Sequence, residues 1–222
     1  MLTFYYHPLS PVARRVWLAL LERQIPFEPV LVDLKGEQHR PDYLALNPFH
    51  HVPVVVDEGV RVLESLAILD YLEAAYPQRP LVPPGAVAIA TMRMVQLVTT
   101  NELTPKLPAL LVASESADAD GETLQQLATV LDFLSQQLQG AAYFGGEDIS
   151  LADITAGATL PLVRRFGFDF ADHPAVAAWL DRLMARPAWQ QTEPSDDAFA
   201  AWKRWMSLMV KRRLRQQQRA AS

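Results

Sequence analysis

The sequence predicts a fold in two parts: an α/β unit followed by a larger unit built only from helices. Segments with strand and helix character alternate through residues 1–78, whereas every segment after residue 89 has the apolar spacing that is typical of a helix. Between the two parts, residues 77–85 hold four prolines and one glycine, which interrupt regular structure. We therefore expect two domains, residues 1–78 and 89–222, joined by a linker at residues 79–88.

The first part is expected to contain a β-α-β unit followed by a β-β-α unit. A strand, a helix and a second strand in that order imply a right-handed parallel connection. The hairpin that follows turns at Asp57-Glu58-Gly59, because these residues separate two short valine-rich runs. The expected strands are Leu2–Tyr6, Phe27–Val32, Pro53–Val56 and Val60–Leu63, and the expected helices are Pro11–Arg23, Pro41–Leu46 and a helix that begins at Ser65.

The second part is expected to consist of five helices. Ser150 and Asp153 have the spacing of a helix cap in which each side chain binds a backbone amide, an interaction worth about 1 kcal/mol. Residues 199–222 carry seven basic residues and no acidic one, and we interpret this basic C-terminal tail as a solvated helix end. The expected helices are Ile89–Val112, Thr123–Leu138, Ser150–Phe166, Pro174–Met184 and Asp196–Leu214.

Composition limits the possible functions. The chain has 222 residues, of which 50% are hydrophobic and 20% charged, as is usual for a folded soluble protein. A formal net charge of −5 argues against nucleic acid as a partner. The chain has no cysteine, which excludes disulfides, thiolate zinc sites and any mechanism that uses a sulfur of the protein itself. No secretory signal and no apolar run of membrane length is evident, so we expect a cytoplasmic protein without membrane contact.

Two short motifs predict a binding pocket. Pro53 has no amide proton and holds Val52 extended, so the backbone here is free to pair with something other than a strand. Glu64 and Ser65 stand where a strand gives way to a helix, and the unpaired amides at a helix N-terminus favour a bound carboxylate. Together the motifs predict a pocket for an extended peptide that carries a carboxylate.

The histidines near this pocket do not predict a metal site. His50 and His51 are neighbours in a loop, and adjacent residues rarely converge on one ion. His39 lies in a separate loop, and no helix presents further His, Asp or Glu ligands at a suitable spacing. We therefore expect no bound metal.

The Val52-Pro53 and Glu64-Ser65 pairs, the proline-rich joint, the helical second part and the Ser150 cap resemble the cytosolic glutathione S-transferases over nearly the whole chain. The segment HPLSPVARRV, residues 7–16, is similar to the catalytic loop of the serine-type classes, phi and theta above all; the cyanobacterial chi class is a further candidate. The resemblance implies a thioredoxin-like N-terminal domain, a helical C-terminal domain that forms the electrophile site, and a homodimer. It also implies glutathione as co-substrate and no tightly bound cofactor.

Site roles follow from the same resemblance. Ser10 would donate a hydrogen bond to the glutathione sulfur, with Tyr6 as the alternative, and Arg14 or Arg15 would add positive potential. A free thiol has a pKa near 8.5 and is mostly protonated at neutral pH, so the enzyme must stabilise the thiolate. Leu9, Pro11, Leu107, Leu111 and Trp202 would contact the electrophile.

The remaining roles concern the glutathione peptide. Val52, in a cis peptide bond with Pro53, would pair with its backbone, and Glu64 and Ser65 would hold its γ-glutamyl end. The family usually has a glycine and then Lys or Gln where this chain has His50 and His51, so His51 would meet the glycine carboxylate in a partly pH-dependent contact. His39 resembles a histidine that binds the same carboxylate in phi and theta enzymes, although the loop here is one residue shorter.

The function implied by the resemblance is the conjugation of glutathione thiolate to small hydrophobic electrophiles, a detoxification activity. Isothiocyanates, aryl halides and lipid peroxide products are candidate substrates. The alternative is a non-catalytic protein of the same fold that binds glutathione or its conjugates. A glutathione-dependent isomerase fits less well, because that branch usually carries a Ser-Ser-Cys loop and this chain has no cysteine.

Overall fold

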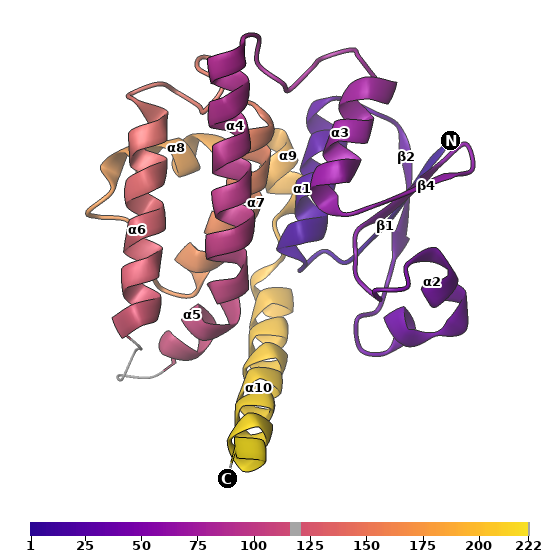
Figure 1. Cartoon of the computed structure of the whole chain (residues 1–222), viewed down its shortest axis with the longest axis vertical. Coiled ribbons are helices and arrows are strands. Elements are labelled where there is room, and N and C mark those ends of the chain that lie inside the picture. Colours follow the sequence, from indigo (N-terminus) through magenta and orange to yellow (C-terminus); the bar gives the residue numbers. More distant parts are fainter. Residues whose placement is uncertain (116–120, 222) are drawn as a thin grey trace.

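A computed structural model describes residues 1–115 and 121–221 of the chain (Figure 1). Residues 116–120 and 222 lie outside the described residues. Most side chains of the basic tail, among them Lys211, Arg213, Arg215 and Arg219, also lie outside this description, so the interpretation of the tail stays a prediction.

The N-terminal part is a thioredoxin-like domain around a mixed sheet. The strand order is β2-β1-β3-β4, with β1 parallel to β2 and antiparallel to β3, and with β3 and β4 as an antiparallel hairpin. Helices α1 and α3 pack against each other beside the sheet (Figure 1). The elements are β1 Leu2–Tyr6, α1 Pro11–Glu22, β2 Phe27–Leu31, a 3₁₀ turn Glu37–His39, α2 Pro41–Leu46, β3 Val54–Asp57, β4 Val60–Leu63 and α3 Ser65–Ala75.

The two faces of this sheet bury different apolar clusters. Successive residues of a strand face opposite sides, and neighbouring Val54 and Val55 accordingly belong to different clusters. Phe4, which pairs with Val55 across β1 and β3, lies with the residues of α1 and α3 in the larger cluster. Val54 packs with Tyr43 of α2 and with Val52 in the smaller cluster, so the loop before β3 is part of a packed layer.

The C-terminal part is helical, as the sequence predicts. Helix α7 lies at its centre, buried from Leu151 to Val163, and contacts α1, α4 and α8 (Figure 1). None of the helices in the described part of the chain combines the length and apolarity needed to cross a bilayer. The helices are α4 Ala86–Val98, α5 Leu107–Ala113, α6 Gly121–Leu138, α7 Leu151–Arg165, α8 Pro174–Met184, α9 Pro187–Thr192 and α10 Asp196–Ala221.

Three details differ from the sequence prediction, two of them at prolines. The single helix expected at Ile89–Val112 is wrong: α4 begins at Ala86, and a π turn and a 3₁₀ turn separate it from α5 around Pro105, which has no amide to donate. Helix α9 is not among the expected helices; it begins at Pro187, which occupies the first helical turn, where a missing amide costs nothing. Helix α10 continues to Ala221, past the expected end at Leu214.

The Ser150 cap is confirmed, and it does more than end a helix. The Ser150 hydroxyl accepts a hydrogen bond from the Ala152 amide, and the Asp153 carboxylate accepts one from the Ser150 amide at 2.7 Å. The same carboxylate, which is fully buried, also accepts hydrogen bonds from the Phe144 amide at 3.0 Å and from the Trp179 indole at 2.7 Å. Asp153 therefore joins the start of α7 to α8 and to the loop before α7.

We expect Asp153→Ala to lower the free energy of unfolding by about 3 kcal/mol or more, because it leaves several buried donors without an acceptor. Urea denaturation followed by circular dichroism measures this loss. Ser150→Ala is the matched control and should cost less, about 1–2 kcal/mol, since it removes the cap and only one of the four donors to the Asp153 carboxylate. Equal losses in the two variants would contradict the wider role of Asp153.

Candidate functional site

A cavity of about 820 Å³ lies between the two domains. Its walls come from the loop before α1, the loop before β3, the start of α3, the π turn after α4, and α10. Ten of the residues predicted from the sequence line this cavity: Leu9, Ser10, Pro11, Arg15, His51, Val52, Pro53, Glu64, Ser65 and Trp202. Five predicted residues are not part of its lining: Tyr6, Arg14, His39, Leu107 and Leu111.

Ser10 lines the cavity as the N-cap of α1. Its hydroxyl oxygen accepts a hydrogen bond from the Ala13 amide at 3.2 Å, which leaves the hydroxyl hydrogen to be donated. The positive end of the α1 dipole lies at the same point. The loop before it is held by His7, whose Nδ1 accepts a hydrogen bond from the Leu9 amide at 3.2 Å. Burial lowers the pKa of His7, against a smaller opposing effect of Asp33, and so favours the neutral ring that this bond requires.

Tyr6 ends β1, and its ring packs inside the N-terminal domain. The ring stacks on Phe4, with centroids 5.0 Å apart, and tilts against Trp17 at 4.9 Å. In the described structure this side chain belongs to the packing around the larger apolar cluster, not to the lining of the cavity.

The loop that carries Val52 is anchored by a buried asparagine. The His51 carbonyl accepts two hydrogen bonds, from the Tyr43 hydroxyl at 2.7 Å and from the Asn47 side-chain amide at 2.9 Å. The peptide between Val52 and Pro53 is cis, and β3 begins only at Val54, so Val52 lies outside the ladder of paired strands. Sequence reasoning missed Tyr43 and Asn47 as positioning residues; a polar residue just before the Pro48 turn was the available signal.

Glu64 and Ser65 stand at the N-terminus of α3. Glu64 has φ 64° and ψ 121°, a left-handed backbone conformation that non-glycine residues rarely adopt and that recurs at ligand sites. Ser65 is the first residue of α3 and is buried, and its hydroxyl accepts a hydrogen bond from Nη1 of Arg15 at 3.3 Å. The pair thus presents a carboxylate and a polarised hydroxyl to the cavity.

Arg15 is a fully buried cation in the cavity wall. Its guanidinium donates from Nη1 to the Thr100 hydroxyl at 3.0 Å and from Nη2 to the Thr104 hydroxyl at 2.9 Å, while Nε has no partner. No acidic residue in the described ranges forms an ion pair with it. Burial lowers the pKa of Arg15 to about 10, so the group still carries its charge at neutral pH. Arg14, by contrast, points away from the cavity and pairs with Glu193.

Three imidazoles gather at one side of the cavity. The ring of His50 lies 4.7 Å from that of His39 and 5.2 Å from that of His51, between centroids. His50, His51 and Gln38 line the cavity, whereas His39 contacts it only through His50. Within residues 1–115 and 121–221, no group of three His, Cys, Asp or Glu side chains has a geometry that suits a metal ion.

The apolar wall of the cavity is aromatic. Trp202, Trp205 and Met206 of α10 line the cavity together with Leu9 and with Pro11, the first residue of α1. Trp202 is held in place by Phe166, whose ring lies parallel to it at 6.3 Å between centroids. Leu107 and Leu111, which were expected at this wall, are buried in the hydrophobic core and are not among the residues that line the cavity. Thr100 and Thr104 line it instead.

Comparison with known proteins agrees with this architecture. Models of the glutathione S-transferase N-terminal and C-terminal domains match residues 4–80 and 89–187. Glutathione S-transferase F10 of Arabidopsis thaliana is 34% identical over 209 residues, covering 86% of this chain and 96% of the relative, and glutathione S-transferase 3 of Zea mays is 33% identical, covering 86% and 92%. A solved glutathione S-transferase from Rhodospirillum rubrum F11 superimposes with a TM-score of 0.72 at 29% identity, covering 88% of this chain and 94% of that one. The chain belongs to the glutathione S-transferase family, which confirms the resemblance predicted from its sequence.

Proposed function

We propose that this protein is a glutathione transferase that adds the thiolate of reduced glutathione to small hydrophobic electrophiles, in a cytoplasmic, detoxifying role. One observation carries the proposal: a hydroxyl donor at a helix N-terminus, a peptide-binding loop and an aromatic wall share one cavity. The thiol proton passes to water, and the sulfur then bonds to the electrophilic carbon. With an aryl halide the halide ion leaves; with an isothiocyanate the nitrogen takes up a proton.

Ser10 is the residue that we assign to the sulfur. Its hydroxyl hydrogen is free while its oxygen caps α1, so the side chain can donate to a thiolate without giving up the cap. The helix N-terminus adds a partial positive charge at the same place. Tyr6 stays the alternative, although its ring packs on Phe4 and Trp17.

The peptide of glutathione would lie along the other walls. The free backbone groups of Val52 would pair with its cysteinyl peptide, and the Glu64 carboxylate and Ser65 hydroxyl would meet the ammonium and carboxylate of its γ-glutamyl end. Arg15, which donates to the Ser65 hydroxyl, makes that hydroxyl a better donor and adds positive potential. Gln38, His50 and His51 are placed to meet the glycine carboxylate.

Calorimetry and a conjugation assay together test the function. We expect reduced glutathione to release heat on binding, and at least one of an isothiocyanate, an aryl halide and an unsaturated aldehyde to be conjugated above the uncatalysed rate. Binding without conjugation of any electrophile would favour the non-catalytic alternative. No binding at millimolar glutathione would reject both.

The two domains are proposed to bind different parts of the reacting pair. Residues 1–78 would hold glutathione, residues 79–88 would link the domains, and residues 89–222 would provide the electrophile wall. Helix α3 ends at Ala75 and α4 begins at Ala86, and the stretch between them contains no helix or strand, which supports this division.

A homodimer is also part of the proposal, as the family resemblance implies. Helix α4 carries an exposed stripe at positions i, i+3, i+7 and i+10, made of Val87, Ala90, Met94 and Leu97. Val87 is 82%, Met94 44% and Leu97 49% exposed, and large apolar side chains exposed along one helix face are typical of a contact surface. A second copy of this chain is the occupant that we assign to it.

Met94→Glu should therefore convert a dimer into monomers, because it places a charge at the centre of the stripe. Sedimentation velocity should give twice the chain mass of 24.8 kDa for the unchanged protein and the single mass for the variant. Leu208→Glu, at an apolar residue of α10 that is 69% exposed, is the control and should leave the dimer intact. A Met94→Glu protein that still sediments as a dimer would rule out α4 as the interface.

A further inference from the structure

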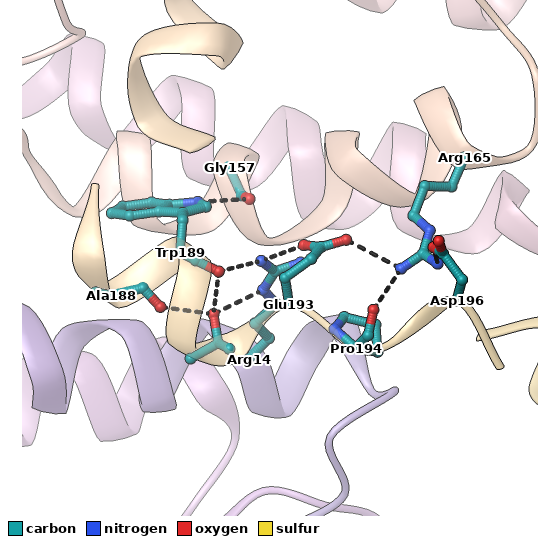
Figure 2. Close-up of polar contacts among 9 residues, drawn as sticks. Arg14, Gly157, Arg165, Ala188, Trp189, Glu193, Pro194 and Asp196 are labelled. Carbon is teal, nitrogen blue, oxygen red and sulfur yellow. Dashed lines mark hydrogen bonds and ion pairs between the residues drawn. The ribbon is translucent and has the colours of Figure 1, made fainter. Parts of the chain in front are cut away.

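A single carboxylate links the helix of the catalytic loop to the start of α10 (Figure 2). Glu193 accepts a hydrogen bond from Arg14 of α1 through Oε2 at 2.7 Å and one from Arg165 of α7 through Oε1 at 3.1 Å. The Arg14 amide in turn bonds to the Ser10 carbonyl at 2.9 Å, in the first turn of α1. Glu193 is therefore connected to Ser10 through the Arg14 side chain and the first turn of α1.

Arg165, on the other side of Glu193, binds the start of α10. Arg165 also donates to the Pro194 carbonyl and to the Asp196 carboxylate, both at 2.8 Å (Figure 2). Its guanidinium lies 3.9 Å from the centre of the Phe199 ring. Phe199 packs on Trp202 at 5.8 Å between centroids. A continuous series of side-chain contacts thus leads from Arg165 through Phe199 to Trp202 in the aromatic wall of the cavity.

The position of Glu193 in the chain also couples it to the start of α10. It directly follows α9, and only Pro194 and Ser195 separate it from α10. Helix α9 is fixed on α7, because the Trp189 indole donates to the Gly157 carbonyl at 2.9 Å, where a Cβ would leave too little room for it (Figure 2). Trp202 lies six residues beyond the start of α10, about 9 Å along the axis, so a small tilt at the start moves the wall.

We propose that Glu193 is a positioning residue that sets the spacing between the sulfur site and the aromatic wall, and thereby the affinity for the electrophile and not for glutathione. The inference rests on the proposed function. Arg14 donates to the Thr192 hydroxyl at 3.1 Å and to the Trp189 carbonyl at 3.3 Å as well, so α1 keeps two ties to α9 when the carboxylate is lost. What is lost is the common acceptor that holds Arg14 and Arg165 together.

The same interface supplies a matched control. Glu22, at the end of α1, forms an ion pair with Arg186 at 2.6 Å, and this pair also joins the two domains. Among the described residues this pair makes no hydrogen bond or ion pair with α10, since Arg186 precedes α9 at the opposite end from Glu193. Glu22→Gln should weaken the domain contact without moving the aromatic wall.

The test compares two stable ligands, S-methylglutathione and S-hexylglutathione, whose difference in affinity reports the apolar wall. We expect Glu193→Gln to weaken the binding of S-hexylglutathione by roughly three- to tenfold and to change the binding of S-methylglutathione by no more than about twofold. Arg165→Met, which keeps the Arg14–Glu193 pair but releases α10, should act alike. In turnover, KM for the electrophile should rise and KM for glutathione should not, whereas Glu22→Gln should change neither.

A second measurement does not depend on any ligand. Trp179 and Trp189 are fully buried, so acrylamide quenching of tryptophan fluorescence reports mainly on the half-buried Trp17, Trp202 and Trp205. Quenching should increase in Glu193→Gln and Arg165→Met but not in Glu22→Gln. Unchanged quenching, or equal weakening of both ligands, would overturn the inference. If the unchanged protein binds neither ligand, the proposed function fails, and the quenching comparison still decides the role of Glu193.

Discussion

Replacing Ser10 with alanine is expected to raise the pKa of the bound glutathione thiol by about one to two units, because a hydrogen bond to a charged group is worth about 1.5–3 kcal/mol. At neutral pH the thiolate fraction, and with it the conjugation rate, should fall about tenfold or more. Titration of the thiolate by its ultraviolet absorbance measures the shift directly. The loss should shrink as the pH rises, since the free thiol ionises near pH 8.5 without help.

Two further variants separate the possible roles of this side chain. Ser10→Asp keeps an acceptor for the Ala13 amide, which is 3.2 Å from the serine oxygen, but has no hydrogen to donate and adds a negative charge beside the sulfur. The added charge raises the thiol pKa by itself, so Ser10→Asp tests the cap: its free energy of unfolding should match that of the unchanged protein, whereas Ser10→Ala should lose about 1 kcal/mol. Tyr6→Phe tests the alternative, and a larger pKa shift in that variant than in Ser10→Ala would transfer the assignment to Tyr6.

Local patterns were enough to predict most of the fold and part of the site. The alternation of strands and helices, the Ser150 cap and the helical second part follow from short-range spacing, which a single sequence contains. Val52 and Ser65 were found because each stands at the boundary of a predicted element, where backbone groups are unpaired, and Ser10 was found through the family resemblance. All three line one cavity in the structure.

Long-range partners could not be predicted in this way. Arg15 meets Thr100 and Thr104 across 85 and 89 residues, and no periodicity links these positions. Leu107 and Leu111 were expected at the cavity through the family resemblance, and in the structure both are buried in the hydrophobic core. Trp202 was recognised through its family resemblance, whereas the tie through Glu193 depends on the packing of three helices.

Arg15→Met should weaken glutathione binding by roughly ten- to a hundredfold while leaving the free energy of unfolding unchanged or higher. The affinity falls because Ser65 loses the donor that polarises its hydroxyl and the cavity loses a positive charge, effects of about 1.5–3 kcal/mol. Stability does not fall, because a buried cation without a carboxylate partner is costly and a thioether of similar length fills its space. Calorimetry with glutathione measures the affinity, and urea denaturation measures the free energy of unfolding.

Arg23 offers a control with the opposite expectation. It is a second buried arginine at the end of α1, but it forms an ion pair with Glu73 at 3.0 Å and donates to the carbonyls of Tyr76 and Arg79. Arg23→Met should therefore cost about 3–5 kcal/mol of stability, since it removes the cation that pairs with a partly buried carboxylate and the donor of two carbonyls. It should not alter glutathione binding in the protein that still folds. If Arg15→Met instead loses as much stability as Arg23→Met and binds glutathione normally, Arg15 is a structural residue, and the positive potential of the cavity must come from the helix N-termini alone.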